Sequence, residues 1–396
     1  MTASNKNNIS ASNLLLLIPG QALNRIAQQT HVNHYIKVLD GESVFCLLLY
    51  ALVECQRNSL RTMQDIFNSA SFKFLFNLPW GKRVRYNSIS ERLSVINPEF
   101  FKQAYELIHS VFSTYYSDQE MEQRLLIRVD STMVAEAANK LKQGIEVGPK
   151  PTRSKATYRK QIKYTFAFDG HLPCAGQVFT HKTYTSECKA VPEVIYRYTQ
   201  KNQGAVFVFD RGMHSRQVMD QLTERETPFV TRIKSNSRYT VARVIEKGDG
   251  RKVGILTLES DMEVRLPYRK SFLKNNYRLI IARNPQTGSV YYFLTNIFDL
   301  EADRIIEYYK KRWDIEVFFR FLKQELNLSH ITSTSENGMQ VMLYMTMICS
   351  MLVLVYKRVN QVGYKTAVRR TAFELNEYII KLIVLYCGGD PSLVFR

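Results

Sequence analysis

A glutamate with three ordered polar neighbours makes one stretch of the chain a candidate for chemistry. Residues 305–326 carry apolar side chains at helical spacing, which is typical of a helix docked on a core. At about 100° per residue, four polar side chains fall on one narrow face of that helix: Tyr309, Arg312, Glu316 and Lys323. The sequence therefore predicts one unbroken amphipathic helix that packs by one edge and presents an acid, a phenol and two cations on the next.

Two aspartates upstream decide how this helix face is interpreted. On its own, Glu316 between two cations would also fit a solvated face with i,i+4 ion pairs. The strand-like runs 125–130 and 204–210 are apolar, and each ends in an aspartate, Asp130 or Asp210, before a small or polar turn. An α/β sheet presents such residues at its carboxyl edge, where ligands bind. Two aspartates and a glutamate are hard oxygen ligands, which suit Mg²⁺ or Mn²⁺ rather than zinc.

The spacing Tyr309-x2-Arg312-x3-Glu316-x6-Lys323 resembles the Y-(2)-R-(3)-E-(6)-K signature of DDE transposases of bacterial insertion sequences, in the subgroup called the IS-four family. Four residues match at fixed spacing, after two strand-end aspartates in the right order, and the resemblance covers about residues 125–328. It implies a ribonuclease-H-like catalytic core. It also implies that the tyrosine, arginine and lysine of the signature contact the transposon end near the cleavage point.

The resemblance assigns the three acids to catalysis. It implies that Asp130, Asp210 and Glu316 are the catalytic residues and the ligands of two Mg²⁺ or Mn²⁺ ions in each active site, with Asp130 bridging both ions. Two ions held about 3.5–4 Å apart by carboxylates can activate water or a 3′-hydroxyl and stabilise the leaving oxygen of a phosphodiester. Hydrolysis and strand transfer then differ only in the nucleophile.

The activity that the resemblance implies is cut-and-paste DNA transposition. Metal-dependent cleavage and strand transfer would occur at the inverted-repeat ends of an insertion sequence, with a hairpin formed on the transposon end. The partners would be double-stranded DNA, both the terminal repeats and the target, and we expect a homodimer on DNA because two ends must be cut. Two other functions remain open: a ribonuclease-H-like nuclease without transposition, and a catalytically idle DNA-binding protein. Inverted repeats flanking the coding DNA would favour the transposase.

The charge distribution favours a polyanionic partner. The 396-residue chain has a formal net charge of +18 and a pI near 9.5. Residues 1–118 hold 11 lysines and arginines against 8 acidic residues, so a net charge of +15 lies on the part that holds the three acids. Carboxylates that must approach phosphate need such surrounding cations. A basic protein that is soluble by charge alone is the alternative.

Residues 139–163 predict a flexible basic loop directly after the Asp130 strand. Eight lysines and arginines there accompany one acid, and glycines and prolines interrupt the segment. We expect contact with the phosphate backbone, rather than only a solvated loop, because the segment follows an active-site strand. The residues assigned to DNA contact outside the helix are Lys150, Arg153, Lys155, Arg159, Lys160 and, beside Asp210, Arg211.

The elements around these residues predict an α/β fold: a ribonuclease-H-like core interrupted by a β-rich insertion, with an N-terminal helical domain. Residues 1–118 have helical patterns and predict a DNA-binding domain, either a helix-turn-helix or a plain helical bundle. Residues 119–233 predict the first part of the core, and residues 300–396 its second part with C-terminal helices. Residues 234–299 alternate apolar and polar residues in short runs and predict the insertion.

One feature departs from the family pattern. Some members stack a tryptophan of the insertion on a flipped base, but the two tryptophans here are Trp80 and Trp313. The stacking role is therefore in doubt, or falls to a candidate such as Tyr239, Phe272 or Tyr291.

The sequence predicts no membrane span. Residues 341–356 are uncharged, but sixteen residues fall short of the roughly 20 that a span needs, and we expect a buried helix. The apolar run near the polar N-terminus is too short for a signal-peptide core. We therefore expect a cytoplasmic bacterial protein that associates with the nucleoid through DNA. The six cysteines form no CxxC pair, so neither a zinc site nor a disulfide framework is indicated.

Overall fold

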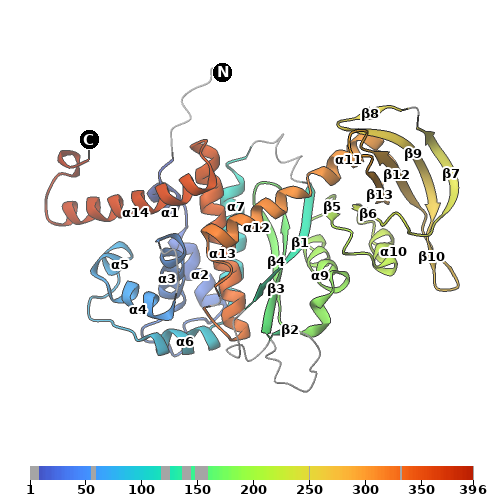
Figure 1. The fold of residues 1–396 in the computed structure, drawn as a ribbon. Coiled ribbons are helices and arrows are strands. Elements are labelled where there is room, and N and C mark those ends of the chain that lie inside the picture. The colour runs from blue at the N-terminus through green and yellow to red at the C-terminus, as the bar shows by residue number, and fades with distance from the viewer. Residues whose placement is uncertain are drawn as a thin grey trace. The chain divides into compact units, whose positions relative to one another are not determined.

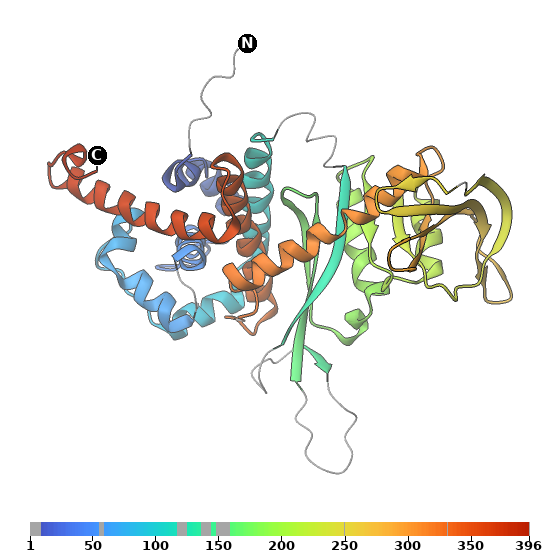
Figure 2. The ribbon, with the colours of Figure 1, turned by 45° about the horizontal axis from the view of Figure 1, so that its top comes forward.

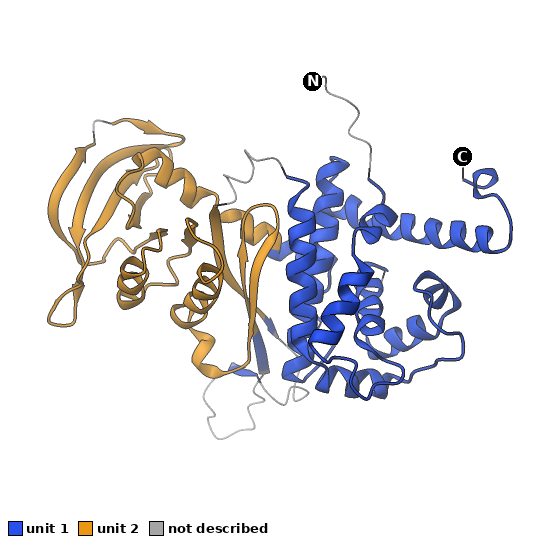
Figure 3. Cartoon of the chain, turned by 180° about the vertical axis from the view of Figure 1, so that it is seen from behind, with its two compact units in different colours: residues 1–117, 134–162, 319–396 blue, residues 118–133, 163–318 orange. Residues whose placement is uncertain are grey.

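The computed structural model describes residues 9–54, 59–116, 125–135, 144–147, 159–248, 250–330 and 332–395. The chain forms two compact units (Figure 3): unit 1 contains residues 1–117, 134–162 and 319–396, and unit 2 contains residues 118–133 and 163–318. Both chain ends belong to unit 1, and the predicted core segments are each divided between the units. The functions assigned to the four predicted segments stay predictions.

Unit 1 is built mainly from helices (Figures 1 and 2). The N-terminal helices, drawn in blue to cyan, gather with the C-terminal helices, drawn in red. An asparagine starts α7, because the Asn97 side chain accepts a hydrogen bond from the Glu99 backbone N at 3.0 Å. The helices are α1 Ala11–Leu16, α2 Gly20–Gln29, α3 Gly41–Glu54, α4 Leu60–Asn68, α5 Ala70–Leu75, α6 Tyr86–Val95, α7 Pro98–Ser113, α13 Glu336–Val359 and α14 Tyr364–Tyr386.

Helix α13 forms the core of unit 1. It packs against α7, α14, α3 and α6. By length and hydropathy alone α13 could cross a membrane, but 83% of its most apolar window is buried inside the protein. Burial against other helices is the environment of a core helix, so the prediction of a buried helix over residues 341–356 is confirmed.

One mixed sheet of eleven strands runs through the described part of the chain (Figure 1), so the fold is mixed α/β. Its order is β2-β3-β1-β5-β6-β13-β12-β9-β7, while β4 pairs with β3 and β8 pairs with β9. The strands are β1 Leu126–Ala135, β2 Ile145–Val147, β3 Arg159–Phe168, β4 Pro173–Phe179, β5 Val206–Phe209, β6 Phe229–Arg232, β7 Thr240–Lys247, β8 Lys252–Val253, β9 Leu256–Arg265, β12 Tyr277–Arg283 and β13 Val290–Thr295; β10 Pro267–Tyr268 and β11 Ser271–Phe272 form a separate pair.

Residues 234–299 contribute the strands β7 to β13, and all of these except the separate pair β10 and β11 extend the sheet of unit 2. Strand β13 pairs antiparallel with β6, with Thr295 opposite Val230. The predicted strand-rich segment is therefore hydrogen-bonded edge to edge with β6, the strand that follows Asp210. Its arrangement as a continuation of one sheet was not predicted from the sequence.

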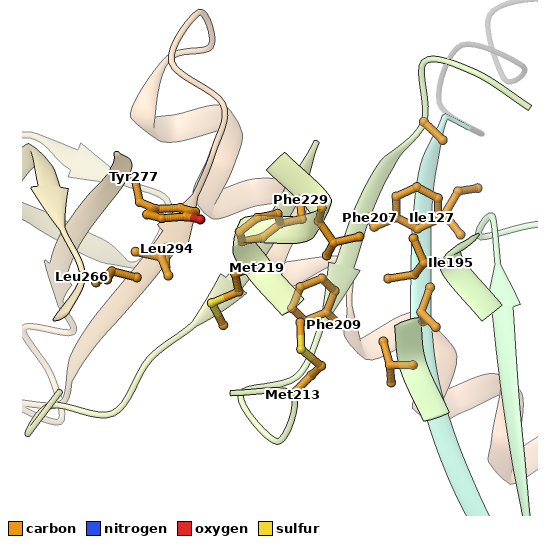
Figure 4. Close-up of a cluster of buried hydrophobic side chains, with 14 of the residues drawn as sticks. Ile127, Ile195, Phe207, Phe209, Met213, Met219, Phe229, Leu266, Tyr277 and Leu294 are labelled. Atoms are coloured by element: carbon orange, nitrogen blue, oxygen red, sulfur yellow. The ribbon is translucent and has the colours of Figure 1, made fainter. Parts of the chain in front are cut away.

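The two faces of the sheet in unit 2 are covered by different helices. Strands β1 and β5 pair in parallel, with Val129 opposite Phe209. Odd-numbered residues of these strands pack in one hydrophobic cluster with α9 Glu187–Thr199 and α10 Arg216–Glu224 (Figure 4). Even-numbered residues such as Val208 pack with α11 Ala302–Lys310 on the other face. Because successive side chains of a strand alternate between faces, the even-numbered Asp130 shares the face of α11.

The single helix predicted over residues 305–326 is wrong, because the chain forms two helices there. Helix α11 ends at Lys310, and α12 Trp313–Glu325 begins after a two-residue junction. The Lys311 carbonyl accepts hydrogen bonds from the Asp314 backbone N and from Arg128 Nε, each at 3.1 Å. A carbonyl committed to these two donors does not accept the i+4 amide that a continuous α-helix requires.

The predicted end of the first aspartate strand is also wrong. Strand β1 continues beyond Asp130 to Ala135, whereas its pairing with β5 stops at Val129. The acid therefore lies where the neighbouring strand ends and not where its own strand ends. In a sequence, an apolar run followed by an acid fits both cases: an acid where the neighbouring strand ends and an acid where its own strand ends.

Candidate active site

The register of β1 and β5 brings the two predicted aspartates to one edge of the sheet. The last paired residues are Val129 and Phe209, so Asp130 and Asp210 each stand one residue beyond the pair. Their side chains are 21% and 45% exposed, which leaves both carboxylates accessible to a ligand. The carboxyl edge of parallel strands is where α/β sheets bind their ligands.

One guanidinium joins the three predicted acids. Arg312, in the junction between α11 and α12, donates a hydrogen bond from Nη2 to Glu316 Oε1 at 2.7 Å. Its Nη1 lies 4.0 Å from Asp130 Oδ2, and its Nε lies 4.0 Å from Asp210 Oδ1. The three carboxylates thus converge on one cationic position. Their assignment as catalytic residues stays a prediction.

The convergence of charge changes the acid–base properties of the site. Burial raises the pKa of Asp130 from 3.8 to about 6, and the neighbouring acids Glu187 and Asp210 add to the rise. The backbone N–H of Ser131 and the Arg312 guanidinium oppose it. Burial alone would lower the pKa of Arg312, but the acids and Tyr309 raise it above its usual range. Ionisation of Asp130 would therefore be favoured by any further cation placed at this edge.

The donor set fits a divalent cation. Within the described ranges, no group of three or more His, Cys, Asp or Glu side chains is arranged as a ready-made metal cage. However, Asp130, Asp210 and Glu316 all lie within 4.0 Å of one cationic group. Carboxylate oxygens are the ligands that Mg²⁺ and Mn²⁺ prefer, and the site has the negative charge to attract them.

Two further side chains, Tyr309 and Arg232, surround the same edge. The Tyr309 hydroxyl donates to Asp210 Oδ1 at 3.3 Å. Arg232, the last residue of β6, lies over the rings of Tyr309 and Tyr291, at 5.6 and 4.7 Å from their centres. Arg232 Nε is buried and has no hydrogen-bond partner among the residues that the structure describes. Arg232 was missed from the sequence, although it ends the strand that follows the two aspartate strands.

A second polar network lies behind Asp130 on the α9 face. Ser131 Oγ lies 2.8 Å from Thr165 Oγ1 and donates to Glu187 Oε2 at 2.6 Å. Lys163 Nζ, on a side chain that is almost fully buried, donates to Glu187 Oε1 at 2.8 Å. The Ser131 backbone N–H in turn donates to Asp130 Oδ1 at 2.8 Å. These residues were also missed, because a serine, a threonine and a lysine in strands have no distinctive sequence pattern.

The other predicted DNA contacts are distributed along the chain. Lys323 lies in the last turn of α12 and is half-buried, and burial lowers its pKa. Arg211 is exposed directly after Asp210. Lys150, Arg153 and Lys155 lie outside the described residues. Their assignment to DNA contact stays a prediction.

The basic loop predicted over residues 139–163 is wrong at residues 145–147 and 159–163, whereas its residues 139–143 and 148–158 lie outside the described residues. Residues 145–147 form β2, and β3 begins at Arg159, with Glu146 opposite Lys160 in an antiparallel pair. Opposite charges directly across such a pair are favourable, which supports strand formation here. Arg159 and Lys160 therefore start a strand, and their contact with DNA stays a prediction.

Comparison with known proteins identifies the class. Residues 122–352, more than half of the chain, match the family described as the transposase DDE domain. The chain therefore belongs to this family of transposases, enzymes that cleave DNA and transfer its strands. Within the class it is a transposase of the IS-four-like kind from bacterial insertion sequences. The resemblance stated from the sequence is confirmed, and with it a function in DNA transposition.

Two curated relatives and one solved structure illustrate this similarity. The chain is 24% identical to a probable transposase for insertion sequence element IS5377 from Geobacillus stearothermophilus, over 70% of this chain and 68% of the relative. It is 30% identical to a putative transposase for insertion sequence element IS4SA from a Synechocystis strain, over 38% of this chain and 41% of the relative. A piggyBac transposase in a synaptic complex with hairpin DNA aligns at 11% identity and a TM-score of 0.48, over 96% of this chain and 83% of that one.

Proposed function

We propose that Asp130, Asp210 and Glu316 are the catalytic residues of this transposase and the ligands of two Mg²⁺ or Mn²⁺ ions in each active site. The observation that carries the proposal is the convergence of three carboxylates within 4.0 Å of the Arg312 guanidinium, at the carboxyl edge of the sheet. When bound, such ions supply activation of the attacking oxygen and stabilisation of the leaving oxygen.

The basic and phenolic groups around the acids would hold the DNA. Arg312 and Arg232 present forked guanidinium groups that match phosphate oxygens, and the Nε of each is buried without a hydrogen-bond partner in the described chain. The exposed Arg211 would bind backbone phosphate beside Asp210. Tyr309 would donate its hydroxyl to a phosphate oxygen, and Lys323 would act as a point charge further along the DNA end. These contacts orient the scissile bond toward the acids.

The substrates would be the terminal inverted repeats of an insertion sequence and the target DNA, in a cut-and-paste reaction with a hairpin on the transposon end. Cutting two ends calls for two active sites, which supports a homodimer on DNA. The acting compartment would be the bacterial cytoplasm, at the nucleoid. For the base-stacking role, Tyr291 is the best placed of the three candidates, because it contacts Arg232 beside Tyr309.

A ribonuclease-H-like core is part of the proposal. The strand order β4-β3-β1-β5-β6, with β1, β5 and β6 parallel and helices on both faces, supports that fold. Strands β7 to β13 would then be the β-rich insertion between the second and third acids. The three acids follow the order predicted from the sequence: Asp130 lies on a strand, Asp210 follows a strand, and Glu316 lies on a helix.

Cleavage of a labelled duplex that carries the DNA flanking the reading frame tests the proposal. With Mg²⁺, the unaltered protein should cut at a defined end, and Glu316→Gln should reduce the rate at least about 1,000-fold, equivalent to about 4 kcal/mol. The matched control is Glu307→Gln, because Glu307 lies on α11 and its ion pairs within the described residues are with Arg304 and Lys311 at the surface. That variant should cut at the unaltered rate.

The alternative functions give different results in the same assay. Binding without any cut in either protein, with Mn²⁺ also supplied, would contradict the catalytic assignments and favour an idle DNA-binding protein. Cleavage that never yields joined products with target DNA would favour a nuclease without transposition. Equal loss of activity in the Glu307 control would show that the assay reports on helix integrity and not on the acid.

A further inference from the structure

A buried arginine lies two residues before Asp130, on the same face of β1. Arg128 is 4% exposed, which is rare for a cation unless it is fully bonded. Its Nη1 donates to the carbonyls of Leu126 and Asp169, both at 2.7 Å. Its Nη2 donates to Asp314 Oδ2 at 2.9 Å, and its Nε donates to the Lys311 carbonyl at 3.1 Å. The guanidinium thus connects three parts of unit 2: β1, the turn between β3 and β4, and the junction between α11 and α12.

The partners of Arg128 adjoin the residues of the candidate site. Lys311 and Asp314 flank Arg312, whose guanidinium contacts all three acids. Glu316 follows one half-turn after Asp314 on α12. Along β1, Arg128 and Asp130 are two residues apart, so their side chains lie next to each other on the same face. The hydrogen bonds of Arg128 therefore connect the strand that carries Asp130 with the helix junction that precedes Glu316.

The same bonds account for the break between α11 and α12. The Lys311 carbonyl is held by Arg128, and Asp314, in the first turn of α12, is paired with the same guanidinium. The junction sets the direction in which the side chains of Arg312 and Glu316 project from α11 and α12. A continuous helix would carry these two side chains at a different angle to Asp130.

We propose that Arg128 is a positioning residue for the transposase reaction: a buried clamp that fixes the junction carrying Arg312 and Glu316 against the strand carrying Asp130. The inference rests on the proposed three-acid centre. None of the four hydrogen bonds of Arg128 goes to an acid of that centre, so it acts through Lys311 and Asp314. A lysine cannot replace it, because one ammonium has no planar fork with which to bond all of these acceptors.

The neighbouring glycine is consistent with a clamp of defined shape. Gly170 follows Asp169 with a φ of +97°, a conformation that other residues rarely adopt. A Cβ at this position would lie 2.8 Å from Arg128 Nη1, which is inside van der Waals contact. The turn between β3 and β4 therefore lies so close to the Arg128 guanidinium that no Cβ fits between them at position 170.

The chain contains a matched control. Arg278, on β12, is also 4% exposed and is paired with the fully buried Asp261 of β9, at 3.0 Å from Nε to Oδ1. This pair has the same burial and joins β9 to β12, and Arg278 Nη1 also donates to the carbonyls of Phe298 and Leu300 before α11. Among the described residues, none of these hydrogen bonds reaches β1 or the junction. Loss of either arginine should therefore destabilise the protein, whereas only loss of Arg128 should misplace the acids.

The experiment compares Arg128→Lys, Arg278→Lys and the unaltered protein on labelled end DNA with Mg²⁺. For Arg128→Lys we expect the single-turnover cleavage rate at saturating DNA to fall about 100-fold while the Kd for DNA changes less than about threefold, as for a displacement of about 1 Å at the reacting groups. Amide hydrogen exchange over residues 311–316 should accelerate. Arg278→Lys should lower the Tm to a similar extent and leave both the rate and this exchange unaltered.

Three outcomes would overturn the inference: an unaltered cleavage rate in Arg128→Lys, an equal loss of rate in Arg278→Lys, or unchanged exchange over residues 311–316. If Arg128→Lys does not fold, Asp314→Asn decides, because Asp314 is half-exposed and its loss removes one bond only. It should slow cleavage about tenfold without weakening DNA binding, and no slowing would contradict the clamp. If the unaltered protein itself does not cut, the proposed function fails, and the exchange measurement alone still tests the clamp.

Discussion

Arg128 and Arg312 lie on the same face of the sheet in unit 2, yet their surroundings are opposite. Arg128 donates four hydrogen bonds, at 2.7 to 3.1 Å. Arg312 has one short bond, to Glu316, two carboxylates at 4.0 Å, and an Nε without a hydrogen-bond partner in the described chain. A fully bonded guanidinium is part of the framework, whereas a partly bonded one has donors left for a ligand. This difference in hydrogen bonding assigns Arg128 to positioning and Arg312 to ligand binding, although both residues are arginines.

The largest effect should follow from loss of Arg312. We expect Arg312→Ala to lower the cleavage rate about 100- to 1,000-fold, because a preorganised donor near the reacting phosphate is removed. The Tm should change little, since Arg312 makes one short bond within its own helix turn. Single-turnover cleavage and thermal unfolding measure the two quantities. Arg304→Ala, on the exposed face of α11, is the control. A large fall in Tm for Arg312→Ala would remove the contrast with Arg128.

Loss of Arg128 should lower stability as well as the cleavage rate, even when an apolar side chain fills its place. Arg128→Leu removes a donor from three carbonyls and leaves Asp314 without its cation, so we expect a loss of about 3 kcal/mol. Thermal unfolding of this variant beside Arg312→Leu measures the difference directly. Similar stabilities for the two variants would show that the bonds of Arg128 contribute no more than those of Arg312.

Asp130 should show the cost of burying a carboxylate beside other acids at this edge of the sheet. Its pKa is raised from 3.8 to about 6, so the folded state binds a proton more tightly than the unfolded state. Stability is therefore lost as pH rises from about 4 to 6, and the loss persists above pH 6. In EDTA, Asp130→Asn should be more stable than the unaltered protein by about 2 kcal/mol at pH 8, and by nothing below pH 4.

Calorimetry or chemical unfolding at both pH values checks this prediction. The same substitution at the exposed Asp299 serves as the control and should give no pH-dependent gain. A gain for Asp130→Asn that is equal at pH 4 and pH 8 would show that its origin is not the buried charge.

The smallest effect concerns the turn that contacts Arg128. Gly170→Ala combines a strained φ of +97° with a Cβ at 2.8 Å from the guanidinium. Gly204→Ala has a similar φ of +79° but nothing within 4 Å of the added Cβ. We expect Gly170→Ala to cost about 1 kcal/mol more than Gly204→Ala, since the second variant carries the backbone strain alone. Equal Tm values would mean that the guanidinium moves aside freely.

The parts of the fold that depend on local pattern were predictable. The strand before Asp210 and the start of α7 at Pro98 follow from an apolar run and from a capping residue with a proline. The four spaced residues of the signature identified the family, and the apolar strand runs placed two aspartates near one sheet edge. Each of these features is encoded within fifteen or fewer consecutive residues.

The parts that depend on distant partners were not predictable. Arg128 stands between Ile127 and Val129 in an ordinary strand, and its partners Asp169 and Lys311 lie 41 and 183 residues away. The helical periodicity of residues 305–326 continues through the junction without a glycine or proline, and the arginine that bonds the Lys311 carbonyl there is distant in sequence. Arg232 likewise became a candidate only when β6 was seen to lie beside β5.

The alternation of side chains along β1 has a consequence for how this gene can change. Gain or loss of a single codon between Leu126 and Asp130 would turn the aspartate from the α11 face to the α9 face, where Ser131 now meets Glu187. A two-codon insertion would restore the face but shift the acid by about 6.6 Å along the strand. The number of β1 residues before Asp130 therefore cannot change without moving the acid. Mutational drift that preserves transposition can substitute side chains here, but it cannot change their number.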